Sequence, residues 1–169
     1  MTGRDFAGVP EDKRDGETLH IGLATHGDVD ALCHLLQALF TQESEFEPLH
    51  GAQEMGLRAI LEDSRTGEIL VARRAARVVG MVNLLYTIST ALGTRVAWLE
   101  DMVVHPEERR AGVGSALLRA ALIHARGRDC QRVTLLTDAT NEGAQRFYRR
   151  QGFTHSAMIP MRIMLPAAD

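Results

Sequence analysis

Two glycines follow an apolar run and a charged loop near the middle of the chain, an arrangement that could bind phosphate. The apolar run ends at Val104, and Pro106 cannot donate to a strand ladder, so the predicted strand closes there. Gly112 and Gly114 then open a segment of helical composition. Glycines let an anion approach the backbone closely, and the N–H groups and dipole of a first helical turn attract its charge. The sequence therefore predicts an anion-binding turn between a strand and a helix.

The spacing of these glycines distinguishes the turn from two common nucleotide-binding motifs. A P-loop requires a lysine directly after its last glycine, and no lysine stands there. The dinucleotide-binding motif Gly-x-Gly-x-x-Gly requires a glycine where this chain has Leu117. What remains is Arg109-x-x-Gly112-x-Gly114. Taken alone, this short motif is equally compatible with a glycine-rich turn that binds no ligand.

Composition favours a single globular domain and argues against several classes of protein. The chain has 169 residues, of which 45% are hydrophobic and 24% charged, with a net charge of −3. No basic cluster is interleaved with aromatic residues, so we expect no nucleic-acid partner. No apolar stretch approaches the roughly 20 residues of a spanning helix, so we expect no membrane association. The N-terminus lacks an apolar signal core, which predicts a cytoplasmic location by default.

The cysteines and histidines give no indication of a metal site. Cys33 and Cys130 lie far apart in the sequence and have no metal-ligand spacing. The seven histidines are scattered, without a His-x-x-x-His or Cys-x-x-Cys pair. We therefore expect two reduced thiols and no bound metal.

Hydrophobic periodicity predicts the elements that must position the turn. Residues 1–17 are polar and are expected to form a flexible tail, which leaves 18–169 as a single domain. The predicted strands are Leu19–Leu23, Ile69–Arg73, Val78–Ile88, Val96–Val104, Val133–Thr137 and one or two strands within Phe153–Leu165. The predicted helices begin near Val29, Ala52, Gly112 and Glu142, the last with Asn141 as its cap. Strands joined by a crossover helix are parallel, so the order predicts a mixed α/β sheet with helices on both faces.

A second pattern follows in the last third of the chain, Asn141-x-x-Ala144-x-x-Phe147-Tyr148-x-x-x-Gly152-Phe153. Both patterns, their separation and the order of elements resemble the GNAT superfamily of acyl-CoA-dependent N-acyltransferases, from about Leu19 to Leu165. The chain departs from the pattern at Arg110, where many relatives have glycine. The resemblance implies a GNAT-like mixed, mostly antiparallel central sheet with a parallel, splayed pair in its middle.

The resemblance also implies acetyl-CoA as the co-substrate, without a metal. Its pantetheine arm would bind the backbone of Met102, Val103 and Val104, where the central strand splays from its parallel neighbour. An N–H group there could polarise the acetyl carbonyl. The pyrophosphate would rest on backbone N–H groups of the turn, namely those of Arg110, Ala111, Gly112, Val113, Gly114 and Ser115. The guanidinium of Arg109 or Arg110 would add attraction, although one of the two is equally well explained as a solvated surface charge.

The implied reaction is direct attack of an amine on the thioester in a ternary complex. An alkyl ammonium has a pKa of about 10.4 and must lose a proton first, which a carboxylate can accept. Glu100 is the candidate base, because Glu-Asp before Met-Val-Val is similar to the strand of spermidine/spermine acetyltransferases. Strand alternation would place Asp101 on the opposite face, and Asp101 remains the alternative. A purely structural role for Glu100 would be an ion pair with an arginine of a neighbouring strand.

Two residues of the second pattern are further candidates. Tyr148 is the candidate general acid that protonates the departing CoA thiolate, whereas Phe147 is explained by packing alone. Asn141 either reaches the cofactor or caps a helix, and the sequence supports both equally.

The acceptor is expected to be a small cationic amine. Glu43, Glu45 and Glu47, with Glu54 nearby, could attract a cation, although acidic runs on loops are more often simply solvated. A protein N-terminal or lysine acetyltransferase, and a non-catalytic acyl-CoA-binding regulatory module, are the alternatives. The resemblance further implies a homodimer, with the C-terminal strands as a possible interface.

Overall fold

The computed structural model describes residues 13–14, 17–41 and 50–165. It divides into two compact units, Met1–Leu136 and Thr137–Asp169, and each is treated by itself below. The observed sheet and the predicted anion-binding turn both belong to the first unit. The second unit contains the Asn-x-x-Ala-x-x-Phe-Tyr pattern.

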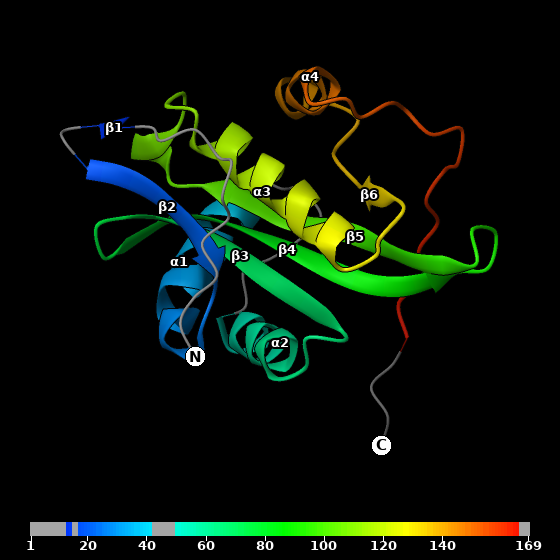
Figure 1. Cartoon of the computed structure of the whole chain (residues 1–169), viewed down its shortest axis with the longest axis horizontal. Coiled ribbons are helices and arrows are strands. Elements are labelled where there is room, and N and C mark those ends of the chain that lie inside the picture. Colours follow the sequence, from blue (N-terminus) through cyan, green and yellow to red (C-terminus); the bar gives the residue numbers. More distant parts are fainter. Residues whose placement is uncertain (1–12, 15–16, 42–49, 166–169) are drawn as a thin grey trace. The chain divides into compact units, whose positions relative to one another are not determined.

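Six strands of the first unit form one mixed sheet in chain order (Figure 1). They are β1 (Lys13–Arg14), β2 (Glu17–Leu23), β3 (Gly67–Arg74), β4 (Arg77–Ser89), β5 (Thr94–Val104) and β6 (Val133–Leu135). Neighbours from β1 to β5 are antiparallel, and β5 and β6 are parallel. The mixed, mostly antiparallel sheet with one parallel pair is therefore confirmed.

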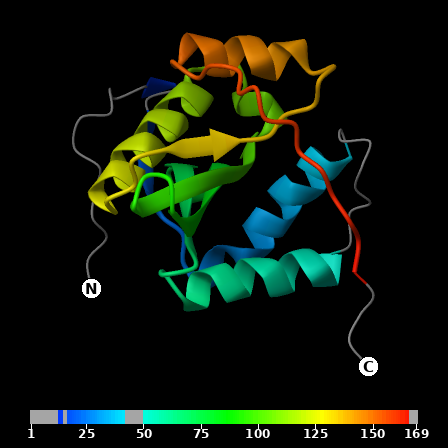
Figure 2. The ribbon, with the colours of Figure 1, turned by 90° about the vertical axis from the view of Figure 1, so that its right-hand side faces the viewer.

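Helices cover both faces of this sheet, as the sequence predicts. One face carries η1 (His26–Asp28), α1 (Val29–Phe40) and α2 (His50–Glu62), and the other carries α3 (Val113–Gly127) (Figures 1 and 2). In the second unit, α4 (Glu142–Arg150) begins directly after Asn141. None of the helices within the described ranges is long and apolar enough to cross a membrane.

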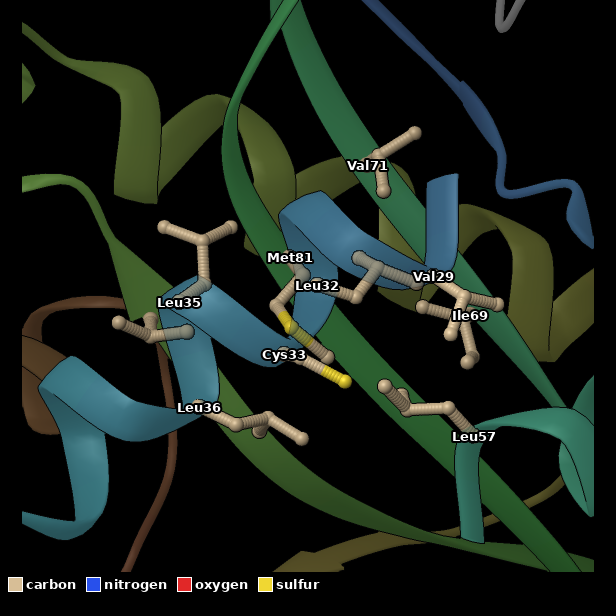
Figure 3. Close-up of a cluster of buried hydrophobic side chains, with 10 residues drawn as sticks. Val29, Leu32, Cys33, Leu35, Leu36, Leu57, Ile69, Val71 and Met81 are labelled. Atoms are coloured by element: carbon tan, nitrogen blue, oxygen red, sulfur yellow. The ribbon is translucent and has the colours of Figure 1, made fainter. Parts of the chain in front are cut away.

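The main hydrophobic cluster lies between α1 and the sheet. The apolar residues of α1 recur at helical spacing, so they share one face and pack on β3 and β4. Leu57 brings α2 onto the same cluster, and Cys33 is buried in it as a small apolar side chain. Figure 3 labels its members Val29, Leu32, Cys33, Leu35, Leu36, Leu57, Ile69, Val71 and Met81.

Two expectations about the ends of the chain are wrong. Lys13, Arg14 and Glu17, expected in the flexible tail, belong to β1 and β2, while 1–12 and 15–16 lie outside the described residues. The described residues 153–165 contain no strand. A strand needs a ladder partner, and Pro160 removes a backbone donor from the middle of that segment. As a result, the parallel pair lies at the edge of the described sheet rather than in its middle.

A buried carboxylate fixes the C-terminal half of α3 to the sheet. Glu68 on β3 accepts hydrogen bonds from the Tyr86 hydroxyl at 2.8 Å, from His124 Nε2 at 2.7 Å and from Arg128 Nε at 2.7 Å. Burial alone would raise the pKa of Glu68, but the bonds from His124, Arg128 and Tyr86 lower it to about 2. The group is therefore ionised at neutral pH, and it orients the helix whose other end forms the predicted anion site.

Replacing Glu68 with glutamine should lower the free energy of unfolding at pH 7 by about 3 kcal/mol, because Arg128 would keep its charge in a partly buried place without an anionic partner. The folded pKa lies below the unfolded value, so the contribution is present above pH ~4.5 and is lost as the pH falls toward 2. Urea unfolding between pH 7 and 2.5 measures this, with exposed Glu62→Gln as the matched control. Equal losses in both variants, or a loss in Glu68→Gln that does not depend on pH, would contradict this account.

Candidate cofactor and amine site

Strand β5 continues beyond the end of its parallel neighbour. β6 pairs with β5 only at Ala97–Leu99, whereas β5 runs on to Val104. Along this extension, one edge of β5 is paired with β4; Val103, for example, lies opposite Met81. Residues 100–104 thus have no β6 partner on their other edge, which is the geometry that lets an extended ligand add to a sheet.

The loop after β5 is anchored by a buried ion pair. Its first turn is η2 (Pro106–Glu108), and Glu108 is buried. Arg74, which is also buried, donates from Nε to Glu108 at 2.9 Å and from a terminal nitrogen to the Glu17 carbonyl at 3.0 Å. Arg77 donates to the other Glu108 oxygen at 2.9 Å. Burial would raise the pKa of Glu108, but the two arginines lower it, so the anchor stays charged.

The turn itself combines two left-handed residues with an uncapped helix start. Arg110 has φ +65° and Gly112 has φ +78°. Gly112 is the N-cap of α3, no side chain of the described residues caps that end, and the Ala116 N–H donates to the Gly112 carbonyl at 3.0 Å. The N–H groups of Val113 and Gly114 lie before this bond, in the first turn, where a helix supplies no acceptor of its own. Backbone and helix dipole together favour an anion at this position.

The surroundings of the turn leave room for a phosphate group. A Cβ placed on Gly112 would meet no heavy atom within 4 Å. Arg109 is exposed, and its Nε donates to the Val104 carbonyl at 3.1 Å, so this side chain ties the turn to the end of β5. Arg110 is exposed beside it and adds positive charge. The residues present fit the phosphates of a cofactor. The Arg109 side chain also has a structural role, because it holds the Val104 carbonyl.

A β-bulge interrupts β5 at the predicted base. Asn83 pairs with Glu100 and Met81 pairs with Val103, so Val82 faces two residues of β5. One of them, Asp101, has a left-handed backbone with φ +49°. The simple alternation expected between Glu100 and Asp101 therefore does not hold here. The Asp101 carboxylate instead accepts a hydrogen bond from Asn83 Nδ2 at 2.5 Å.

The two neighbouring carboxylates have different environments. Glu100 is exposed, and Asp101 is half-buried. Burial, followed by the charge of Glu100, raises the pKa of Asp101 to about 6, against the opposing effect of the Asn83 bond. The expected structural role of Glu100, an ion pair with an arginine of a neighbouring strand, is not seen among the contacts of the described residues.

The second unit holds the other two candidates. The Asn141 side-chain oxygen accepts from the Ala144 N–H at 3.0 Å, so it caps α4; its contact with a cofactor stays a prediction. Tyr148 packs edge-on against Phe147 and Phe153, with centroids 5.2 Å and 5.7 Å away. Burial raises the pKa of Tyr148 to about 12. The phenol therefore keeps its proton at neutral pH.

The acidic residues proposed to attract the acceptor receive little structural support. Glu43, Glu45 and Glu47 lie outside the described residues. Glu54 forms an i,i+4 ion pair with Arg58 at 2.8 Å, so its charge is offset locally.

Sequence reasoning did not find three residues that shape the site. These are Asn83, which lies within the predicted strand Val78–Ile88, and Arg74 and Glu108, which lie just outside the predicted strands Ile69–Arg73 and Val96–Val104. The paired arginines that flank the two-residue turn after β3 were the available signal for the anchor. No local pattern shows that a strand will bulge at Asp101.

The left-handed backbone at Arg110 should affect the free energy of unfolding of variants at this position. Arg110→Gly should be about 1 kcal/mol more stable to urea unfolding than Arg110→Ala, because both lose the charge but only alanine keeps the left-handed strain. The same two substitutions at exposed Arg119 in the middle of α3 are the control, and there alanine should be the more stable by about 1 kcal/mol. The same order at both positions would contradict the left-handed assignment.

Comparison with known proteins identifies the family of this chain. Residues 29–153 match the family model described as the Acetyltransferase (GNAT) family. Over 97 residues the chain is 38% identical to mycothiol acetyltransferase of Mycobacterium leprae, covering 56% of this chain but only 29% of that relative. It is 29% identical to aminoalkylphosphonate N-acetyltransferase of Salmonella typhimurium, covering 79% of this chain and 83% of the relative.

A solved structure supports the fold. A possible acetyltransferase from Clostridium difficile superimposes with a TM-score of 0.80 over 88% of this chain and 99% of that chain, at 19% identity. The two proteins therefore share this fold. The chain belongs to the GNAT family of acetyltransferases.

Proposed function

We propose that this chain is an N-acetyltransferase that moves an acetyl group from acetyl-CoA to a primary amine by direct attack. One observation carries the proposal: the edge of β5 beyond Leu99 leads through an anchored turn into the uncapped N-terminus of α3. An extended arm and a pyrophosphate need these two features, in this order. Membership of the GNAT family supports the same conclusion.

The backbone would hold the cofactor in two places. Met102 and Val103 are the principal partners of the pantetheine arm, because the Val104 carbonyl already accepts from Arg109. The N–H groups from Arg110 to Ser115 would receive the pyrophosphate, with Arg110 adding charge. Acetyl-CoA, when bound, supplies the activated acetyl carbonyl, and a β5 N–H group directed at its oxygen would stabilise the charge that develops there.

Two ionisable side chains would take part in proton transfer. A β5 carboxylate takes the proton that an ammonium must lose before it can attack. Tyr148 is the proposed donor to the leaving sulfur. Its pKa of about 12 exceeds the roughly 8.5 of a thiol, so transfer to a fully formed thiolate is uphill, and the phenol would act only while the charge is developing. Its contribution should therefore be modest.

The acceptor we propose is a small cationic amine. The chain matches most of the length of a relative named aminoalkylphosphonate N-acetyltransferase, which supports a small-molecule acceptor. A protein N-terminus or lysine is the alternative. A homodimer and a cytoplasmic location remain part of the proposal, the first from the family resemblance and the second from the sequence.

The proposal predicts thiol release from acetyl-CoA with at least one member of a panel of polyamines, amino acids, aminoglycosides, aminoalkylphosphonates and short peptides. Tyr148→Phe should lower kcat by about 10-fold, below the ~10²-fold at which general acid catalysis usually begins. Phe147→Leu, a change on the same helix without a hydroxyl, is the control. Thiol detection and mass analysis of the acetylated amine are the measurements.

Different outcomes would lead to different conclusions. Turnover on peptides but not on free amines would move the assignment to a protein acetyltransferase. Acetyl-CoA binding with no turnover on any amine would contradict the catalytic proposal and favour a regulatory acyl-CoA-binding module. If acetyl-CoA does not bind and its addition does not raise the Tm of the protein, the proposed cofactor site would be contradicted as well.

A further inference from the structure

The bulge in β5 holds a buried amide whose hydrogen-bonding capacity is only half used. Asn83 is 2% exposed, and its buried Oδ1 atom has no hydrogen-bond partner among the described residues. Its Nδ2 donates to Asp101. A buried, unpaired carbonyl costs about 1–3 kcal/mol, so native structures usually satisfy it or use it. Its position beside a half-buried carboxylate points to a use.

The Asn83 amide can serve Asp101 in both of its protonation states. When the carboxylate is ionised, the Asn83 N–H donates to it, as seen. When the carboxyl is protonated, an amide turned by 180° would accept the new O–H with its carbonyl oxygen. An amide side chain, which has both a hydrogen-bond donor and an acceptor, is therefore suited to a neighbouring carboxyl group that is protonated and deprotonated during the reaction. Arginine partners, such as those of Glu108, would hold a carboxylate permanently ionised.

The backbone of the bulge brings Asp101 toward this amide. A left-handed φ at a non-glycine residue costs about 1–2 kcal/mol, and such strain concentrates at functional sites. Asp101 also stands directly before Met102, the first residue proposed to contact the pantetheine arm. Glu100 is exposed and is the register partner of Asn83, so it lies beside the pair as a second negative charge.

We propose that Asp101, held by Asn83, is the carboxylate that accepts the proton of the acceptor ammonium, and that Glu100 tunes it without taking that proton. The proposal rests on the proposed N-acetyltransferase function. It replaces the sequence-based preference for Glu100 as the base.

The proton balance of the step is complete. The acceptor arrives as R–NH3+ and loses one proton to Asp101. The nitrogen lone pair attacks the thioester carbon, the C–N bond forms, and the C–S bond breaks. A second nitrogen proton reaches the leaving sulfur, directly or through Tyr148, to give the free thiol. Asp101 then releases its proton to solvent.

Among the described residues, few other titratable groups lie where they could control Asp101. The elements with the most contacts to β5 are β4, β6, α1 and α3. Their buried or half-buried titratable groups are engaged elsewhere: Tyr86 and His124 on Glu68, and Cys33 in the hydrophobic cluster. The remaining charged or titratable groups of these elements are exposed, namely Asp30, His34, Arg77, Arg119 and Arg126. Glu100 is therefore the charge next to Asp101, and Asn83 its polar partner.

The test is the pH profile of kcat/KM with the best acceptor of the panel, in wild type and four variants. Asp101→Asn should lose about 10²- to 10⁴-fold in kcat. Asparagine tolerates the left-handed backbone, so this variant should still fold. Glu100→Gln should lose less than about 10-fold in kcat. It should also move the acid limb of the profile, the pH range in which kcat/KM falls as Asp101 is protonated, to lower pH, because removing the neighbouring charge lowers the pKa of Asp101.

The Asn83 variants test the positioning role. Asn83→Leu should move the acid limb to higher pH, because it removes the bond that favours the ionised carboxylate. Asn83→Ser, which keeps a donor and an acceptor, should restore the limb toward its wild-type position. A loss of packing alone would lower the Tm in both variants and would leave the acid limb of the pH profile at the same pH in both. Side-chain 13C NMR titration of Asp101 gives the same shifts without any acceptor.

Three results are decisive. Loss of activity in Glu100→Gln with activity retained in Asp101→Asn would overturn the inference and leave the proposed function intact. An Asp101 carboxyl that titrates at its ordinary value, unaffected by Asn83→Leu, would also overturn it. Absence of turnover in the wild-type protein with every amine would contradict the proposed function itself.

Discussion

The N–H groups of Val113 and Gly114 lie in the first turn of α3, where a helix supplies no acceptor of its own, and much of the first unit serves to hold this turn in place. Glu68 fixes the C-terminal half of α3 to β3 and β4 through three hydrogen-bonding partners. The buried Arg74–Glu108 pair fixes the loop that enters the helix. Helix and turn are thus attached at both ends to the same sheet. A preformed group of donors costs little reorganisation when an anion arrives.

Four carboxylates of the described residues lie in two environments with opposite consequences. Glu68, Glu108 and Asp28 are buried, which would raise each pKa, but arginine and other donors lower it instead. These groups stay ionised and act structurally. Asp101 has a neutral amide as its partner and a second carboxylate beside it, so its pKa rises to about 6. A group that can gain and lose a proton near neutral pH is suited to acid–base chemistry.

Much of the fold followed from local sequence features, because helical periodicity, Asn141 as a cap and the strand–turn–helix order are short-range signals. The predicted C-terminal strands failed because a strand depends on a partner that its own residues do not specify. The same limit applies to the site. The glycine turn was predictable, whereas the bulge at Asp101 and the Arg74–Glu108 anchor depend on residues 18 and 34 positions apart. Long-range pairing of this kind leaves no local pattern to read.

The central claim is that the turn from Arg110 to Ser115 binds the cofactor pyrophosphate through its backbone. Titration of the 15N-labelled protein with free CoA, followed by amide chemical shifts, tests this most directly. The account predicts large shifts for Arg110 to Ser115 and for Met102 and Val103, with α2 (His50–Glu62) nearly unchanged. Binding of CoA that leaves the amides of the turn unperturbed would contradict the account.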